Sequence, residues 1–508
     1  DLLTPPLARA WRASGGECEI VPPDPDAIAA AAERPEIVLL VEPAGRSPEE
    51  AFLGLADLLK AVDARTGGEP ALALLVTRAL FDVTGAEALD AASAPLEALA
   101  RCVPQERPSL RMAVVDWAGE APHADWTARQ IVAGCLTDQL DLTNAFRGRT
   151  RWTRRPEPMA LTEGRIAANT VLITGGSGRL GQALAGGLAE RGVKTVALLS
   201  RDPAPLGDEL RTAAEGAGCR ILTVAGDVAD PAALEAALRT VRSSTGPIDG
   251  LIHAAGLTSE AGFRPLDQTD AELVRRQFAP KVAGTRNLIA ALDGEPAWGV
   301  LFSSISGLLG GLGFAAYAGA NLYLDAAATA ARRNDGGTAW TSIQWDAFAD
   351  EGQGVGLSAD EALMVVAAAA AAGTPPSFLV SAGELEERIA HWLLGVGAAA
   401  PEPEAAEQRR QRHERPALSS EFAAPESEDE ERMRAIWERL LGISGLGTTD
   451  DFFELGGHSL LGVQLIGQVR EAFGANVAVS DIFETPTIRG LTARAAAARV
   501  DTEAALEG

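Results

Sequence analysis

Apolar runs alternate with segments of helical spacing along the first part of the chain. Residues 36–41, 73–76 and 111–116 are dominated by apolar side chains over the length of a strand and predict buried strands. Between the first two, residues 48–62 repeat apolar side chains at helical spacing. Strands that alternate with helices form parallel sheets, so residues 1–164 predict a Rossmann-like unit. Because this part has no glycine-rich phosphate loop, we expect it to be structural and free of cofactor.

A second series of strands begins at Thr170, directly before a glycine-rich loop. The predicted strands are residues 170–174, 195–199, 220–225, 250–253, 299–303 and 341–345. Helical segments separate them, and this spacing predicts a doubly wound parallel sheet. We assign residues 165–395 to this second unit.

The strand pattern stops before residue 396, and a helical pattern replaces it. Residues 396–425 are rich in Pro, Ala, Glu and Arg without a hydrophobic period, which predicts a linker. Residues 426–500 predict a small helical domain, because apolar side chains recur at helical spacing: Met433, Ile436, Trp437, Leu440 and Leu441. Residues 501–508 are a tail. The predicted fold class is therefore α/β, with two Rossmann-like subdomains followed by a helical bundle.

Length, charge and cysteine content narrow the classes of function. A chain of 508 residues is too long for one core, and its net charge of −26 argues against nucleic-acid or anionic-membrane partners. The four cysteines and five histidines have no disulfide or metal-ligand spacing, so we expect no metal site and a reducing, cytoplasmic location. No apolar run is long enough to span a membrane and no signal peptide is visible. Because the chain begins at Asp1, we expect a piece of a longer polypeptide.

The loop after the first strand of the second unit has the G-x-G-x-x-G spacing. It consists of Gly175, Gly176, Ser177, Gly178, Arg179, Leu180 and Gly181. Glycines permit a tight turn and a close backbone approach, and the helix that follows presents free N–H groups to a pyrophosphate. The position between a strand and a helix predicts a dinucleotide site. The alternative is a tight turn without a ligand.

The end of the next strand indicates which dinucleotide binds. It ends at Ser200-Arg201, and an arginine there suits the 2′-phosphate of NADPH, whereas an acidic residue would hold the ribose of NAD. Asp202 follows directly and leaves NAD open. Further cofactor contacts are expected where later strands end: Asp227 and Val228 beside the adenine, and His253, Ala254, Ala255 and Gly256 beside the nicotinamide-side ribose.

Four residues have the chemistry of carbonyl reduction. Tyr317 and Asn321 lie four residues apart on a predicted helix and share a face, and Ser304 ends a strand. Hydride delivery to a ketone leaves an alkoxide, which a tyrosine phenol can protonate if a cation such as Lys281 lowers its pKa. Ser304 would donate to the carbonyl oxygen, and Asn321 would orient the lysine or a water. The alternative is a buried tyrosine and a surface lysine.

Residues 165–395 resemble the ketoreductase domains of modular polyketide and hybrid polyketide/peptide synthases, in the short-chain dehydrogenase/reductase superfamily. The matching segments are residues 174–181, 227–228, 253–256, 280–284, 302–307 and 317–321. The resemblance implies that Lys281, Ser304, Tyr317 and Asn321 are the catalytic residues. Residues 1–160 are similar to the structural subdomain of that family, including Pro104-Gln-Glu-Arg-Pro108.

The chain departs from that family at positions that bear on stereochemistry. Arg179 stands where the phosphate loop often has glycine. Residues 257–260 read Leu-Thr-Ser-Glu instead of the Leu-Asp-Asp of one product class, and Leu309 replaces the tryptophan of the other class. We therefore assign no configuration to the alcohol.

The segment Asp451-Phe-Phe-Glu-Leu-Gly-Gly-His-Ser-Leu460 precedes a predicted helix. Its glycine pair leaves the backbone before Ser459 open to a large enzyme, and the helix dipole favours a phosphodiester at Ser459. The alternative is that Ser459 serves as a helix N-cap. The segment resembles the attachment site of carrier domains, and its Gly-Gly-His-Ser form is closer to peptidyl carriers. The resemblance implies 4′-phosphopantetheine on Ser459 and a phosphopantetheinyl transferase as partner.

Together the two resemblances imply an NADPH-dependent reductase of a ketoacyl thioester that is carried in cis. The ketone would be β to the thioester in a polyketide-type module, or α in a depsipeptide-type module. Neighbouring adenylation, condensation or ketosynthase domains of a multienzyme synthase are the implied partners. Two alternatives remain: a catalytically silent reductase scaffold that serves as carrier and docking module, and a stand-alone reductase of small ketones or sugars.

Overall fold

The computed structural model forms two compact units, one within residues 1–384 and the other mainly from residue 385 onward. It describes residues 2–31, 35–41, 45–87, 89–137, 139–257, 262–292, 294–333, 337–348, 356–371, 373–386, 388–389, 413–415, 420, 422–441, 443–452, 454–455, 459–475, 477 and 481–507. No helix in these ranges is both long and apolar enough to cross a membrane.

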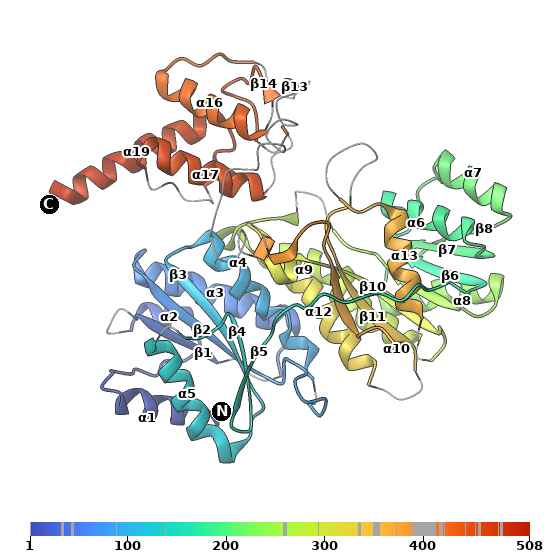
Figure 1. Cartoon of the computed structure of the whole chain (residues 1–508), viewed down its shortest axis with the longest axis horizontal. Coiled ribbons are helices and arrows are strands. Elements are labelled where there is room, and N and C mark those ends of the chain that lie inside the picture. Colours follow the sequence, from blue (N-terminus) through green and yellow to red (C-terminus); the bar gives the residue numbers. More distant parts are fainter. Residues whose placement is uncertain are drawn as a thin grey trace. The chain divides into compact units, whose positions relative to one another are not determined.

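The first sheet has five strands in the order β1-β2-β3-β4-β5 (Figure 1). The strands are β1 (Ile37–Val41), β2 (Ala71–Arg78), β3 (Leu110–Trp117), β4 (Thr143–Arg147) and β5 (Thr150–Thr153). Four of them are parallel, and β5 pairs antiparallel with β4. One face packs on α1 (Thr4–Ala13) and α5 (Ala124–Thr137), and the other on α2 (Pro25–Ala29), α3 (Pro48–Thr66) and α4 (Leu96–Glu106).

Local signals determine where α3 begins and ends. Ser47 accepts from the backbone N–H of Glu50 while the Glu50 side chain accepts from Ser47, which forms a capping box, and Pro48 occupies the first turn. Gly67 ends the helix in the left-handed conformation, with φ of +63°. Between these caps the buried face of α3 carries apolar side chains such as Phe52 and Leu59.

The second sheet has seven parallel strands in the order β12-β11-β10-β9-β6-β7-β8. They are β6 (Thr170–Thr174), β7 (Thr195–Ser200), β8 (Arg220–Ala225), β9 (Gly250–His253), β10 (Trp298–Ser304), β11 (Ala339–Trp345) and β12 (Ser377–Val380). One face packs on α6 (Arg179–Glu190), α7 (Asp208–Ala217) and α13 (Ala359–Ala370). The other packs on α8 (Pro231–Thr245), α10 (Gly284–Ala291) and α12 (Ala315–Ala331). Shorter elements are η1 (Ala91–Ser93), η2 (Ala121–His123), η4 (Leu266–Gln268), α9 (Ala271–Phe278), η5 (Ala279–Ala283) and α11 (Ser306–Leu309).

Helix α12 is buried on nearly all sides, between the second sheet and α3 of the first subdomain (Figure 1). Its composition permits this, because alanine and glycine dominate and a helix that is apolar all round needs partners all round. At Gly319 an added Cβ would lie 3.1 Å from both a ring carbon of Phe52 and the carbonyl oxygen of Pro95. The two subdomains therefore share one core along this helix.

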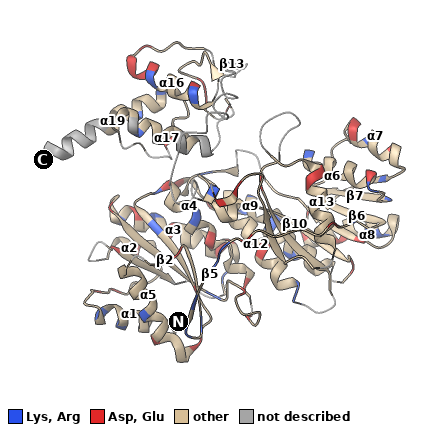
Figure 2. Cartoon of the chain, in the orientation of Figure 1, with Lys and Arg blue, Asp and Glu red and all other residues tan. Residues whose placement is uncertain are grey.

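The second unit contains a small helical bundle. Its helices are α16 (Glu428–Leu441), α17 (Ser459–Phe473), α18 (Asp481–Glu484) and α19 (Ile488–Glu507). Figure 2 shows acidic residues at the start of α16, where the helix dipole favours negative charge. The bundle core centres on Trp437, whose ring meets Phe452 edge to face with centroids 5.2 Å apart.

Part of the segment predicted as a linker, residues 396–425, contacts the bundle. Strand β13 (His413–Glu414) pairs with β14 (Ile443–Ser444). Arg415 donates to both oxygens of the buried Asp450 carboxylate, at 2.7 and 2.8 Å. Residues 396–412 lie outside the described part of the chain.

The predicted α/β fold class is confirmed, and the strands predicted from residue 170 onward match β6 to β11 within two residues at each end. Three strands of the two α/β sheets, β4, β5 and β12, were not predicted, and of these only β5 departs from the expected parallel pairing. Strand β5 is fully exposed and antiparallel, so it carried no hydrophobic pattern to detect. Strand β12 is only four residues long and half-buried, which is too short for a periodicity signal.

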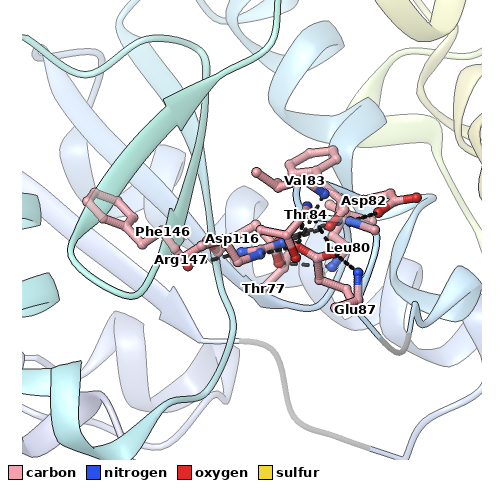
Figure 3. Close-up of polar contacts among 12 residues, drawn as sticks. Thr77, Leu80, Asp82, Val83, Thr84, Glu87, Asp116, Phe146 and Arg147 are labelled. Carbon is pink, nitrogen blue, oxygen red and sulfur yellow. Dashed lines mark hydrogen bonds and ion pairs between the residues drawn. The ribbon is translucent and has the colours of Figure 1, made fainter.

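A buried ion-pair network holds the loop after β2 against the end of β3 (Figure 3). Arg147 donates to Asp116 at 2.6 Å and to Glu87 at 2.8 Å, and all three side chains are buried. Asp116 also accepts from the backbone N–H groups of Leu80 and Phe81. Although burial raises the pKa of Glu87, hydrogen bonds from Arg147 and the loop lower it to about 2.

We predict that Arg147→Met lowers the free energy of unfolding by about 3–5 kcal/mol, because it leaves two buried carboxylates without their cation. Arg151→Met is the matched control, since Arg151 pairs with Asp141 at the surface and its loss costs less than about 1 kcal/mol. Urea denaturation of both variants and the native chain measures the difference. Equal effects of the two substitutions would contradict the prediction.

Candidate active site

The loop between β6 and α6 accepts only glycine at three positions. Gly175 has φ of +77°, a left-handed conformation that favours glycine. A Cβ on Gly176 would lie 2.6 Å from the side chain of Leu198, and one on Gly181 would lie 2.6 Å from the carbonyl oxygen of Gly175. The three glycines therefore let the chain turn sharply against the sheet and enter α6 directly.

This loop lies at the point where the strand order of the second sheet reverses. Strand β6 pairs with β7 on one side and with β9 on the other, so the loops after β6 and β9 diverge from neighbouring strands. A Cβ on Gly175 would lie 2.9 Å from the carbonyl oxygen of Ala254. Gly178 caps α6 without a side-chain hydrogen bond to its first turn. A bare helix N-terminus at a topological switch point fits a dinucleotide pyrophosphate.

The residues predicted to distinguish NADPH from NAD lie at the end of β7. The Ser177 and Ser200 hydroxyls are 2.6 Å apart, and Ser177 also accepts from the N–H of Ala204. These contacts hold the chain after β7 beside the glycine loop. Arg201 is exposed there, where its side chain is accessible to a phosphate in solvent, and Arg179 is exposed in the first turn of α6.

The predicted adenine contacts follow β8. The Asp227 carboxylate accepts from the N–H of Ala229 at 2.9 Å, and Asn287 of α10 donates to the carbonyl oxygen of Val228 at 3.0 Å. Val228 is buried against Gly284. These bonds place the chain after β8 at the same edge of the sheet as the glycine loop.

Three of the predicted catalytic residues come together where β10 meets α12. Asn321 is fully buried and donates from Nδ2 to the carbonyl oxygen of Tyr317, 2.9 Å away. Its Oδ1 has no hydrogen-bond partner among the described residues. Ser304 ends β10, is 9% exposed, and accepts from the N–H of Ser306. The Phe263 and Phe314 rings meet the Tyr317 ring edge to face at 5.4 and 5.7 Å.

Lys281 reaches the same place from a π-helical turn, η5. Its Nζ donates to the carbonyl oxygen of Phe302 at 2.8 Å, and its side chain is 5% exposed. A Cβ on Gly256 would lie 2.8 Å from its Cε, so the glycine of the expected ribose-binding segment leaves room for the lysine. Burial lowers the pKa of Lys281 to about 8, although the charge of Asp325 opposes this.

Burial and neighbouring hydrogen-bonding groups shift the pKa of Tyr317 in opposite directions. Burial raises the pKa of its phenol, and hydrogen bonding with Ser304 and Asn321 opposes the rise. The Lys281 ammonium, which the sequence predicts to act on this phenol, donates to the carbonyl oxygen of Phe302. A raised pKa keeps the phenol protonated at neutral pH, as a proton donor requires.

His253 ends β9 between the glycine loop and Lys281. Its Nδ1 lies 2.6 Å from the Thr174 hydroxyl, and its Nε2 is buried without a partner among the described residues. Burial and the charge of Lys281 lower its pKa to about 3. The imidazole is therefore neutral at neutral pH.

Asp325 was not singled out from the sequence. It is 9% exposed on α12, one turn after Asn321, and burial raises the pKa of its carboxyl to about 7. The available signal was a lone acidic residue inside an otherwise apolar helix, four residues after a catalytic candidate.

The expected phosphopantetheine site is only partly described. Helix α17 begins at Ser459, as predicted, and Phe452 is buried before it. Residues 456–458 lie outside the described part of the chain, and so do residues 258–260, which bear on stereochemistry.

Two segments of the chain match known family models. Residues 169–350 match the family model of the KR domain, and residues 431–495 match that of the phosphopantetheine attachment site. The sequence resemblance to ketoreductase and carrier domains is thereby confirmed.

Curated relatives are much longer than this chain. Pikromycin polyketide synthase component PikAIII of Streptomyces venezuelae is 32% identical over 366 residues, 64% of this chain and 23% of that protein. Erythronolide synthase EryA3 of Saccharopolyspora erythraea is 30% identical over 455 residues, 82% of this chain and 14% of that protein. The chain thus spans less than a quarter of either relative.

Solved ketoreductases share the fold. PlmKR1, from the first module of phoslactomycin biosynthesis in Streptomyces sp. HK803, has a TM-score of 0.60 at 28% identity, covering 74% of this chain and 87% of that one. The first ketoreductase of the tylosin PKS has a TM-score of 0.61 at 26% identity, covering 72% of this chain and 84% of that one.

We predict that His253 makes the chain sensitive to acid. The unfolded imidazole binds a proton below pH 6.5 and the folded one only near pH 3, so its contribution to stability is complete above pH 6.5 and is lost as pH falls. The slope reaches about 1.4 kcal/mol per pH unit. Urea unfolding between pH 7 and 4.5 should show a smaller slope for His253→Asn than for the native chain. Equal slopes in His253→Asn and the native chain would refute the prediction.

Proposed function

We propose that this chain, which contains a KR domain followed by a phosphopantetheine attachment domain, reduces a ketoacyl thioester carried on its own phosphopantetheine arm. The observation that carries the proposal is the convergence of Lys281, Ser304, Tyr317 and Asn321 beside a glycine loop that fits a dinucleotide. The product is a hydroxyacyl thioester.

NADPH, when bound, supplies the hydride that reduces the carbonyl carbon. Tyr317 donates its phenolic proton to the carbonyl oxygen, so the ketone gains one hydride and one proton and becomes an alcohol. Ser304 donates a hydrogen bond to the same oxygen as negative charge develops on it. The Lys281 ammonium stabilises the tyrosinate that remains, and Asn321 orients the residues or water that restore its proton.

The exposed Arg201 supports NADPH over NAD. A guanidinium can form a bidentate ion pair with the 2′-phosphate of NADPH. The 2′-hydroxyl of NAD is neutral and cannot form such a pair. The remaining cofactor contacts are those of the glycine loop, Ser200, Asp227-Val228 and the segment 253–256.

The attachment domain supports a substrate held in cis rather than a free ketone. Ser459 is the proposed acceptor of 4′-phosphopantetheine, which a phosphopantetheinyl transferase would add. The relatives are named as polyketide synthases, which favours a β-keto group over an α-keto group. Neighbouring synthase domains, such as a ketosynthase, would then supply the acyl chain.

The function is tested on the whole chain with a β-ketoacyl phosphopantetheine loaded on its carrier. Addition of NADPH should raise the intact mass by about 2 Da, the two hydrogens of the reduction. An α-keto chain loaded in the same way reports the other substrate class. No mass gain with either chain, in a protein that binds NADPH, would favour a silent scaffold and overturn the proposal.

Tyr317→Phe should lower the reduction rate by about 10²- to 10⁴-fold, because it removes the proton donor and keeps the ring. NADPH affinity, measured by fluorescence titration, should not change. Tyr323→Phe is the matched control, since Tyr323 is the other tyrosine of the chain and lies buried on the same helix. Full activity of Tyr317→Phe would refute the assignment.

Ser459→Ala should block attachment of phosphopantetheine and leave reduction of a free thioester mimic intact. Intact mass after treatment with a phosphopantetheinyl transferase and coenzyme A measures the first effect, and NADPH consumption measures the second. Ser444→Ala, in β14 of the same bundle, should be modified like the native chain. Modification of Ser459→Ala would place the attachment site elsewhere.

A further inference from the structure

Asp325 is a buried acid next to the proposed active site, and packing does not account for it. It lies on α12 one turn after Asn321 and two turns after Tyr317, so the three residues share a face of the helix. Its side chain is 9% exposed, among alanines and leucines. A buried carboxylate is costly unless partners compensate it, so its partners indicate what it does.

In the described part of the chain, only one oxygen of the Asp325 carboxyl accepts a hydrogen bond from the second sheet. Ser342 of β11 donates to Oδ1 at 2.6 Å, whereas the Ser303 hydroxyl of β10 donates to the carbonyl oxygen of Asn321 at 3.1 Å. Oδ2 is buried without a hydrogen-bond partner among the described residues. The hydrogen bond at Oδ1 therefore holds the carboxyl in place. Oδ2 carries negative charge that can interact electrostatically with nearby cations.

Lys281 and Asp325 are bound to neighbouring positions of two paired strands. The lysine Nζ donates to the carbonyl oxygen of Phe302 in β10, and the carboxylate accepts from Ser342 of β11, which pairs in register with Leu301, the residue before Phe302. Both side chains are removed from water, where opposite charges attract more strongly. The carboxylate is therefore placed to hold the lysine in its charged form.

We propose that Asp325 is a positioning residue that keeps Lys281 protonated beside Tyr317. The inference rests on the proposed reductase function, because the ammonium matters there for stabilising the tyrosinate. Burial raises the pKa of Asp325 to about 7, so the carboxylate is present over the pH range in which Lys281, with a pKa of about 8, begins to lose its proton.

Few other charges face this pair. The elements β10, β11, β12, η1 and α11 next to α12 contain no ionisable side chain. Glu272 and Arg275 of α9 pair with each other at the surface, and Arg286 of α10 acts on Tyr323. His253 is neutral, and Arg154 and Glu97 of the first subdomain act on Asp325 with opposite signs.

The chain allows a direct measurement, because its three lysines are Lys60, Lys194 and Lys281. Lysine labelled with ¹³C at Cε gives one titrating NMR signal for each, and Lys281→Met assigns the third. Asp325→Asn keeps the shape of the carboxyl without its charge and should lower the pKa of Lys281 by about one unit or more. This readout needs neither NADPH nor activity.

The same variant should shift the pH profile of reduction. The basic limb of kcat/KM for a free thioester mimic should move to lower pH, with roughly fivefold less activity at pH 8 for a shift of one unit from a pKa of about 8. Asp346→Asn is the matched control. Asp346 is also buried in this subdomain, but its carboxylate accepts hydrogen bonds from the backbone N–H groups of Ala347 and Ala382. Asp346→Asn should change neither the basic limb of the kcat/KM profile nor the pKa of Lys281.

Ser342→Ala provides a second test if Asp325→Asn does not fold. It removes the bond that lowers the pKa of Asp325, so the carboxylate forms at higher pH and the pKa of Lys281 should fall by a smaller amount. An unchanged Lys281 titration in a folded Asp325→Asn or Ser342→Ala chain would overturn the proposal. A native chain that titrates as expected but reduces no thioester would refute the reductase function instead.

Discussion

The close packing of α12 between two sheets is the constraint on which the active site depends. The helix consists mainly of alanine and glycine, so β10 and β11 approach it from one side and α3 from the other. At Gly319 an added Cβ would lie 3.1 Å from both Phe52 and Pro95, so a larger residue would require these neighbours to shift. Because Gly319 lies between Tyr317 and Asn321, contacts with the first subdomain help to position both residues.

The same burial controls the charges of the site. Removal from water favours the neutral form of every ionisable group, so the pKa values of Tyr317 and Asp325 rise and those of Lys281 and His253 fall. The pKa values of the lysine and the aspartate therefore lie close together near neutrality. The charge of Asp325 raises the pKa of Lys281, and this effect underlies the positioning role that we propose for the aspartate.

The two sheets have the same α/β class but opposite chemistry at their carboxyl edges. In the second sheet that edge has a glycine loop and an uncapped helix start. In the first sheet the Asp116 carboxylate accepts hydrogen bonds from the backbone N–H groups of Leu80 and Phe81. Arg147 forms an ion pair with the same carboxylate. The Asp116 carboxylate at this edge is therefore engaged by its own loop and by Arg147.

The sequence by itself determined the features that depend on neighbouring residues. Strands β6 to β11, the glycine loop and the face shared by Tyr317 and Asn321 follow from hydrophobic period, turn geometry and helical spacing. The exposed hairpin strand β5 left no such pattern. The role that we propose for Asp325 was equally hidden, since Lys281 and Ser342, on which it rests, lie in separate segments of the sequence. Tertiary structure alone decided the pKa values, because they depend on burial and on distances between residues far apart in the chain.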